Sequence, residues 1–143
     1  MNGTNLLIDT NIFLEILFDQ DRHEACHDFM RAINQELLGQ KIYITDFSLH
    51  AIQAACRKKN AEFIRDLLLT IRSEKISVVR STVDDDIMTN LIRKTFNLDF
   101  DDAIQYMAAL RTNSKIVTYD KDFNNKEIEA TTPEECLRKI IKN

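Results

Sequence analysis

A short apolar run near the start of the chain ends in a carboxylate and passes at once into a helical pattern. The run 5–8 is followed by Asp9, and apolar residues then recur at the spacing of one helix face: Ile12, Phe13, Ile16 and Leu17. This arrangement predicts a buried strand with Asp9 at its carboxyl end. In open α/β sheets ligands bind at that edge. Asp is also a favoured helix N-cap, which is the better explanation of Asp9 taken alone.

Strands and helices alternate along the whole chain. Further β-rich runs lie at 42–44 and 76–79, at 116–118 and around Ile128, with helical patterns between them. This alternation predicts an α/β fold with a parallel sheet covered on both faces. A length of 143 residues suits one domain spanning 1–143.

Two of the predicted helices carry apolar residues whose burial has to be explained. The first predicted helix of the pair, 61–72, bears more apolar residues than a thin domain easily covers: Phe63, Ile64, Leu67, Leu68 and Ile71. The second begins at a capping box formed by Thr82 and Asp85. It is expected to turn four apolar side chains inward: Ile87, Leu91, Ile92 and Phe96.

Composition excludes several classes of protein. No apolar stretch approaches about 18 residues, so a membrane span is not expected, and the polar start is unlike a signal peptide. Three widely spaced cysteines suit reduced thiols in the cytoplasm. A net charge of −4 argues against generic attraction to nucleic acid, although a local basic patch is compatible with it.

Carboxylates recur at the predicted strand ends. Asp9 and Asp120 each follow a short strand, and Asp102 lies in the first turn of the helix before the Asp120 strand. Asp122, Asp99 and Asp101 lie within reach of the same edge if the two strands are neighbours. Clustered carboxylates repel unless a cation lies among them, and Mg²⁺ accepts such ligands. Each acid alone also fits a cap or a turn, but their joint placement favours a metal site.

The same segments resemble the PIN-domain family, and especially its small VapC-type toxin ribonucleases. The resemblance lies in the runs 7–13, 102–104 and 116–123, in order and spacing. It implies a three-layer α/β/α sandwich and a nuclease site dependent on Mg²⁺ or Mn²⁺. The matching metal-binding and catalytic acids are Asp9, Asp102 and Asp120, with Asp122 as an additional metal ligand; the polar positions beside them are Thr10, Asn11 and Thr118.

One position departs from the family pattern. A glutamate usually occurs early in the helix after the second strand, and here that position falls on Ala51, beside His50. The nearest acid is Asp46, one helical turn away. Three roles are open for His50: a substitute ligand, which would favour Mn²⁺ over Mg²⁺, a contact to phosphate, or a partly buried structural residue.

The sequence therefore predicts a metal-dependent endoribonuclease acting on RNA phosphodiesters, as the toxin of a toxin–antitoxin pair. The absence of the usual glutamate favours an alternative function. In this alternative the protein is a degenerate PIN-like module that binds RNA or a protein without cleavage. A weaker alternative is a phosphatase-like enzyme with Asp9 as nucleophile, which would usually have Asp where Asn11 stands.

Partners follow from the same resemblance. They are an RNA substrate, an antitoxin protein and a second copy in a homodimer, with the apolar set on 61–72 as the expected contact. Candidate RNA contacts outside the site are Lys58 and Lys59, together with four other basic residues: Lys41, Arg57, Arg93 and Lys94.

Overall fold

The computed structural model describes residues 5–123 and 127–142. Its sheet has five parallel strands in the order β3-β2-β1-β4-β5. The strands are β1 (Asn5–Ile8), β2 (Ile42–Thr45), β3 (Ser77–Val79), β4 (Ser114–Val117) and β5 (Ala130–Thr131). The helices are α1 (Thr10–Leu17), α2 (His23–Asn34), α3 (Asp46–Ala55), α4 (Ala61–Arg72), α5 (Val83–Phe96), α6 (Phe100–Thr112) and α7 (Pro133–Lys142). Two short 3₁₀ turns, η1 (Lys58–Asn60) and η2 (Lys121–Phe123), complete it.

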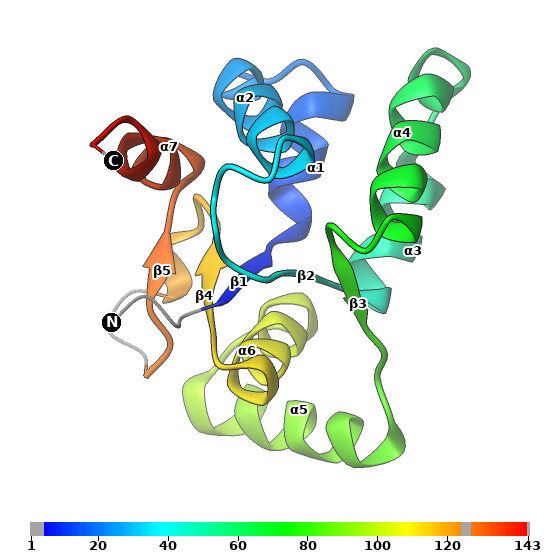
Figure 1. The fold of residues 1–143 in the computed structure, drawn as a ribbon. Coiled ribbons are helices and arrows are strands. Elements are labelled where there is room, and N and C mark those ends of the chain that lie inside the picture. Colours follow the sequence, from blue (N-terminus) through cyan, green and yellow to red (C-terminus); the bar gives the residue numbers. More distant parts are fainter. Residues whose placement is uncertain (1–4, 124–126, 143) are drawn as a thin grey trace.

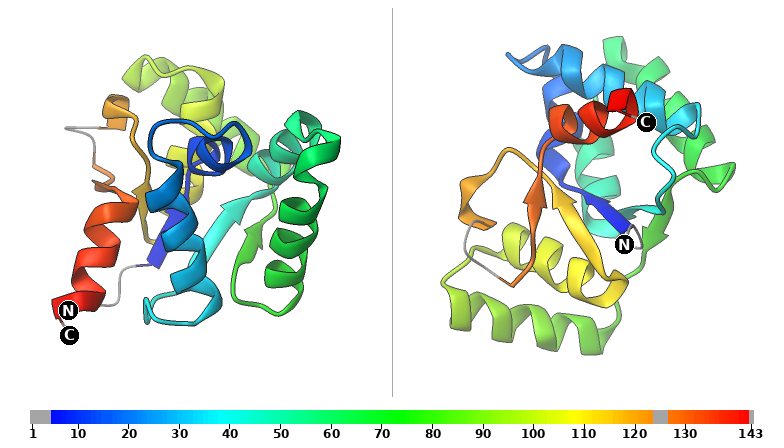
Figure 2. Two further views of the ribbon diagram at one scale, coloured as in Figure 1. Left: turned by 90° about the horizontal axis from the view of Figure 1, so that it is seen from above. Right: turned by 60° about the vertical axis from the view of Figure 1, so that its left-hand side comes forward.

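Helices cover both faces of the sheet, which confirms the predicted three-layer sandwich. Helices α1, α2 and α7 lie on one face and α5 and α6 on the other, while α3 and α4 extend from the β2–β3 end (Figure 1). Two further views separate the layers clearly (Figure 2).

The central strand β1 divides the core into two clusters. Successive side chains of a strand point to opposite faces. Leu6 and Ile8 accordingly pack with α1 and α2, whereas Leu7 packs with the α6 residues Ala103 and Met107. A strand buried on both faces reads as a continuous apolar run, which is why 5–8 was recognisable in the sequence.

One prediction about the helices was wrong in detail. Ile92 on α5 is buried, but Ile87 and Leu91 are 66% and 57% exposed, so α5 turns these two side chains outward. Helix α2 ends at Asn34. Glu36 adopts a positive φ of 57°, which ends the helix and leaves Leu37 exposed.

The apolar set on α4 is mostly accommodated within the chain. Leu67 is buried, and Phe63, Ile64 and Ile71 are half-buried against the core. Only Leu68 is exposed, at 38%. The surplus of apolar surface that was expected on this helix is therefore small.

Within the described ranges, no helix has the length and apolar character needed to cross a membrane. The three cysteines are free thiols, with Cys26 and Cys136 buried.

We expect Leu7→Ala to lower the free energy of unfolding by about 2–5 kcal/mol, because Leu7 is fully buried and its truncation leaves a cavity. The measurement is urea unfolding followed by circular dichroism. Leu37→Ala is the matched control, since Leu37 is 51% exposed and should change stability by less than about 0.5 kcal/mol. Equal effects of the two substitutions would contradict the assigned packing of β1.

Candidate metal centre

Parallel pairing of β1 with β4 brings the first two acids to one edge. The Asp9 backbone N–H donates to the carbonyl of Val117 at 3.0 Å, directly after the paired strands end. Asp120 follows β4 by three residues and reaches the same edge. The adjacency on which the predicted site depended is therefore present.

Thr118 links these two acids. Its Oγ1 donates to Asp9 Oδ2 at 2.7 Å and accepts the backbone N–H of Asp120 at 2.9 Å. Asp120 Oδ1 in turn accepts the backbone N–H of Asp122 at 2.8 Å. Thr118 is buried, so the predicted supporting position fixes the orientation of Asp9.

The start of α6 supplies the third acid. Asp99 caps this helix by accepting the backbone N–H of Asp102 at 3.1 Å. Capping holds Asp102 in the first turn, where it is buried beside Asp120. Carboxylate oxygens of Asp102, Asp120 and Asp122 lie within 4.8 Å of one another. We call these three residues with Asp9 the acidic cluster.

Burial and mutual repulsion raise the pKa values of the two buried acids. The pKa of Asp9 rises to about 6, chiefly because burial disfavours its charged form, and the hydrogen bond from Thr118 opposes part of this rise. The pKa of Asp102 rises to about 8, first through burial and then through the charges of Asp120, Asp99 and Asp9. Asp102 therefore retains its proton near neutral pH in the metal-free protein.

The donor set suits a hard divalent cation. Its donors are all carboxylate oxygens, which Mg²⁺ and Mn²⁺ prefer to nitrogen or sulfur. Asp102, Asp120 and Asp122 come close enough to share one ion, and Asp9 is tied to them through Thr118. The residues present therefore fit the predicted metal.

A buried polar network beside the cluster was not foreseen. Gln105 Nε2 donates to Ser48 Oγ at 2.7 Å and to Thr10 Oγ1 at 3.4 Å, and Ser48 also bonds to Thr10 at 2.6 Å. The network joins α6, α3 and α1, and it explains the role of the predicted position Thr10. One signal was available in the sequence: Gln105 is a polar residue in an apolar helix, three positions after Asp102.

Ala51 and His50 are neighbours in α3, but their side chains lie on different faces of this helix. Phe47 and Ser48 precede Ala51 by four and three positions, so the three share a helix face. That face looks toward α6, since the Phe47 ring lies 5.8 Å from the Phe100 ring and Ser48 bonds to Gln105. His50 is exposed and is not among the described residues whose donor atoms gather.

Asp46 does not replace the missing glutamate. Its carboxylate accepts the backbone N–H and the hydroxyl of Ser81, both at 3.0 Å, and so fastens α3 to the segment that leads into α5.

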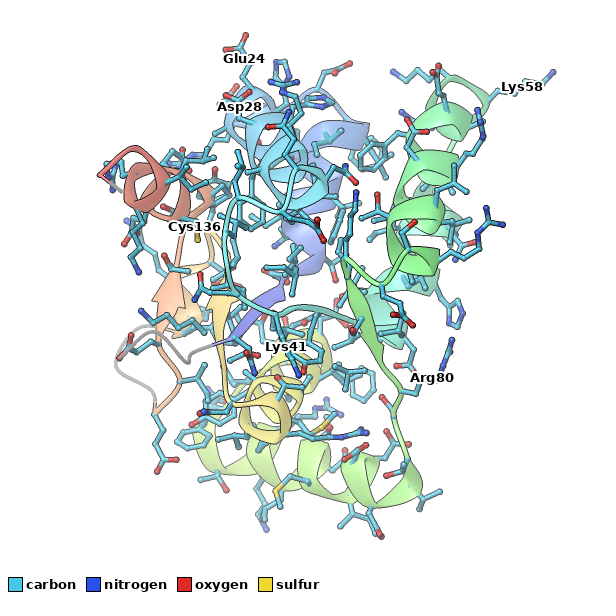
Figure 3. The ribbon with its side chains drawn as sticks, viewed as in Figure 1. Glu24, Asp28, Lys41, Lys58, Arg80 and Cys136 are labelled. Carbon is cyan, nitrogen blue, oxygen red and sulfur yellow. The ribbon has the colours of Figure 1, made fainter. Side chains whose placement is uncertain are left out.

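The remaining candidates lie around the periphery. Asn11 is exposed beside Thr10, and Lys58 and Lys59 are exposed in η1. Figure 3 shows Lys58 at the outer tip of the α3–α4 pair. Lys41 directly precedes β2 and lies at the amino ends of the strands, the edge opposite Asp9.

Comparison with known proteins decides the family. The family model described as PIN domain matches residues 6–129. The chain belongs to the PIN-domain family. No curated protein matches its sequence.

Solved structures share this PIN fold at low sequence identity. A toxin–antitoxin complex from Klebsiella pneumoniae has a TM-score of 0.62 at 17% identity, covering 90% of this chain and 98% of that chain. VapBC2 from Rickettsia felis, bound to a promoter DNA fragment, has a TM-score of 0.63 at 11% identity, with coverage of 90% and 98%. PAE2754 from Pyrobaculum aerophilum has a TM-score of 0.64 at 16% identity, covering 98% of this chain and 91% of that one.

We expect the metal-free protein to lose stability as pH rises from about 4 to about 8. The pKa of Asp102 is about 8 in the folded protein, against about 3.9 for an unfolded Asp. The folded state therefore binds more protons in this window, and the free energy of unfolding must fall as pH rises. Thermal melts in EDTA across this range measure the effect.

Asp102→Asn should flatten that pH dependence and leave the protein equally or more stable at pH 8, since an amide retains the shape without the charge. Asp101→Asn is the matched control, because Asp101 is exposed in the same helical turn. A steep pH dependence retained in Asp102→Asn would mean that another group causes it.

We expect Ala51→Glu to raise Mg²⁺ affinity, because its side chain begins on the helix face that looks toward α6 and adds a carboxylate. His50→Gln should leave Mg²⁺ and Mn²⁺ affinities unchanged, since His50 is exposed. Isothermal titration of both ions into wild type and both variants provides the measurement. A selective loss of Mn²⁺ affinity in His50→Gln would support the histidine-ligand hypothesis, and unchanged affinities in Ala51→Glu would show that this helix does not face the ion.

Proposed function

We propose that this PIN-domain protein is a metal-dependent endoribonuclease. The observation that carries the proposal is the convergence of carboxylate oxygens from Asp102, Asp120 and Asp122 within 4.8 Å, beside the buried Asp9. Membership of the PIN-domain family, whose members are generally nucleases, supports it. Asp9, Asp102 and Asp120 are the proposed catalytic acids, and all four acids of the cluster are proposed metal ligands.

The chain's own residues prepare the site for a cation. When bound, a divalent ion supplies charge stabilisation at the phosphodiester and lowers the pKa of water. Thr118 holds the Asp9 carboxylate in place through its hydroxyl. Asp102, with a pKa of about 8, must release its proton as the ion enters, so metal binding should liberate protons near neutral pH. Either Mg²⁺ or Mn²⁺ meets these requirements.

We propose RNA as the substrate, with Lys58 and Lys59 as contacts away from the acidic cluster. Both side chains are exposed and lie in one short turn. They would therefore attract the phosphates of RNA at a place apart from the negative charges of the acidic cluster. Because Lys58 lies at the outer tip of the α3–α4 pair (Figure 3), these residues would bind a distal part of the RNA.

We also propose an antitoxin partner, a homodimer and a cytoplasmic location. One structure of the same fold is described as a toxin–antitoxin complex, and another is described as VapBC2 bound to promoter DNA; both support the antitoxin partner. A neighbouring gene for a small DNA-binding protein, together with its co-purification, would test the antitoxin.

The alternative is a PIN-like module that binds RNA or a protein without cleaving. Ala51 favours it, because this residue leaves the helix face toward α6 without a carboxylate. The presence of all four acids favours the enzyme.

We expect Mg²⁺ or Mn²⁺ to stimulate cleavage of single-stranded or structured RNA and EDTA to abolish it. Asp102→Asn should reduce metal-stimulated cleavage by at least about 100-fold, since it removes a charge that the ion requires. Gel analysis of labelled RNA gives the rates.

Asp101→Asn is again the control and should cleave as wild type does. RNA binding by wild type without cleavage under any metal condition would favour the non-cleaving module. Cleavage by Asp102→Asn at the wild-type rate would make Asp102 a structural residue.

A further inference from the structure

Two aromatic rings meet where α3 and α6 begin. Phe47 is the second residue of α3 and Phe100 is the first residue of α6. Their rings pack edge to face, with centroids 5.8 Å apart and an angle of 79° between the ring planes. Helix α3 begins directly after β2 ends, so this pair lies at the carboxyl edge of the sheet, the edge at which Asp9 follows β1.

Phe100 leaves part of its ring in contact with solvent. The residue is 36% exposed, whereas Phe47 is half-buried. The guanidinium carbon of Arg93 lies 5.7 Å from the centroid of the Phe100 ring. Arg93 is exposed in the last turn of α5 and forms no ion pair in the described part of the chain. We call Phe47, Phe100 and Arg93 the aromatic patch.

The aromatic patch lies beside the acidic cluster and not within it. Phe100 precedes Asp102 by two positions, about 3 Å along the helix axis and just over half a turn around it. Asp102 accordingly lies beside Asp120, while Phe100 contacts α3 and α5. A strand of RNA whose phosphodiester lies at the acids would therefore carry a neighbouring base past the Phe100 ring.

We propose that Phe100, supported by Phe47 and Arg93, is a stacking site for an unpaired base of RNA next to the phosphodiester that is cleaved. Any base has a face that can stack on an aromatic ring, but in a duplex the neighbouring bases already occupy that face. The site therefore favours single-stranded or looped RNA. The inference rests on the proposed function only in taking RNA as the substrate.

The charges around the aromatic patch indicate that stacking supplies more of the affinity than electrostatic attraction. Asp99 and Asp101 flank Phe100 in the sequence, and both are exposed. They repel phosphate and offset the attraction of Arg93 for it. Stacking of a base on the Phe100 ring is not opposed in this way. We therefore expect removal of the ring to cost more affinity than removal of the Arg93 charge.

Binding of short RNA in EDTA tests the stacking site without cleavage. The probes are a labelled single strand of about eight adenosines and a strand of the same length made of abasic ribose phosphates. Fluorescence anisotropy gives the two dissociation constants. We expect wild type to bind the adenosine strand at least about fivefold more tightly, because stacking of one base contributes that much or more.

Phe100→Leu should bind the two strands with similar affinity, because it keeps an apolar side chain but removes the ring. Phe100→Tyr keeps the ring and should show the wild-type preference for bases. Leu110→Ala is the matched control, since Leu110 is 44% exposed near the other end of α6. It should also retain the wild-type preference.

Arg93→Ala should weaken binding of both strands about equally, because the guanidinium would contact phosphate and not a base. It should also reduce the slope of log affinity against log salt concentration by about 0.7, the value for one phosphate contact on a single strand. Arg72→Ala is the control. Arg72 is exposed in the last turn of α4, which leads to the amino end of β3, the opposite edge of the sheet.

Phe100→Trp provides a direct signal, because the chain contains no tryptophan of its own. Stacking of adenine on the indole should quench its fluorescence as the adenosine strand is added in EDTA, and the abasic strand should not. Leu110→Trp carries the same reporter near the far end of α6 and should show no change with either strand.

Three results would overturn the stacking site: failure of wild type to prefer the adenosine strand, a preference that Phe100→Leu retains, or unquenched fluorescence in Phe100→Trp. Each would favour a protein partner for the aromatic patch. Metal-stimulated RNA cleavage together with any of them would keep the endoribonuclease and remove only the stacking site. Absence of both cleavage and RNA binding would remove both.

Discussion

The candidate site depends on the parallel pairing of β1 with β4. This pairing places the residues that follow the two strands at one sheet edge, where Asp9 and Asp120 share Thr118 as a hydrogen-bond partner. A buried acid such as Asp9 would not ordinarily lie beside a second acid, because desolvation and repulsion both disfavour its charged form. Backbone hydrogen bonds of the sheet and the cap of α6 hold them together. The stability of the fold therefore offsets the unfavourable electrostatic energy of the clustered acids.

This opposition gives the cluster its chemical character. Because Asp102 retains its proton near neutral pH among other acids, a divalent ion that replaces this proton would relieve the repulsion between the carboxylates. Perturbed pKa values of buried carboxylates in a cleft are typical of functional sites, although structural networks also produce them. The oxygen-only donor set and the family relationship both favour the functional explanation here.

Much of the fold could be predicted because β1, β2 and β4 each contain an apolar run that is soon followed by polar residues. Asp9 and Asp120 were identifiable for the same reason, and Asp102 was identifiable as an acid in the first turn of a helix. The orientation of α5 could not be predicted, since the helical period shows which residues share a face but not which face meets the core. Ile87 with Leu91 and Ile92 with Phe96 form two faces of equal apolar character. Only the packing of α6 against one of them decides between the two.

The polar network could not be predicted for a different reason, because one polar residue in an apolar helix does not show which helices it joins. Gln105 nevertheless connects three helices that each contribute to the site. Its Oε1 is buried without a hydrogen-bond partner in the described part of the protein. Through its amide nitrogen, Gln105 ties α6 to α1 and α3. If α6 moved along its axis, the hydrogen bonds of Gln105 would break and Asp102 would move with the helix. The position of Asp102, one of the proposed catalytic acids, therefore depends on how α6 is placed against α1 and α3.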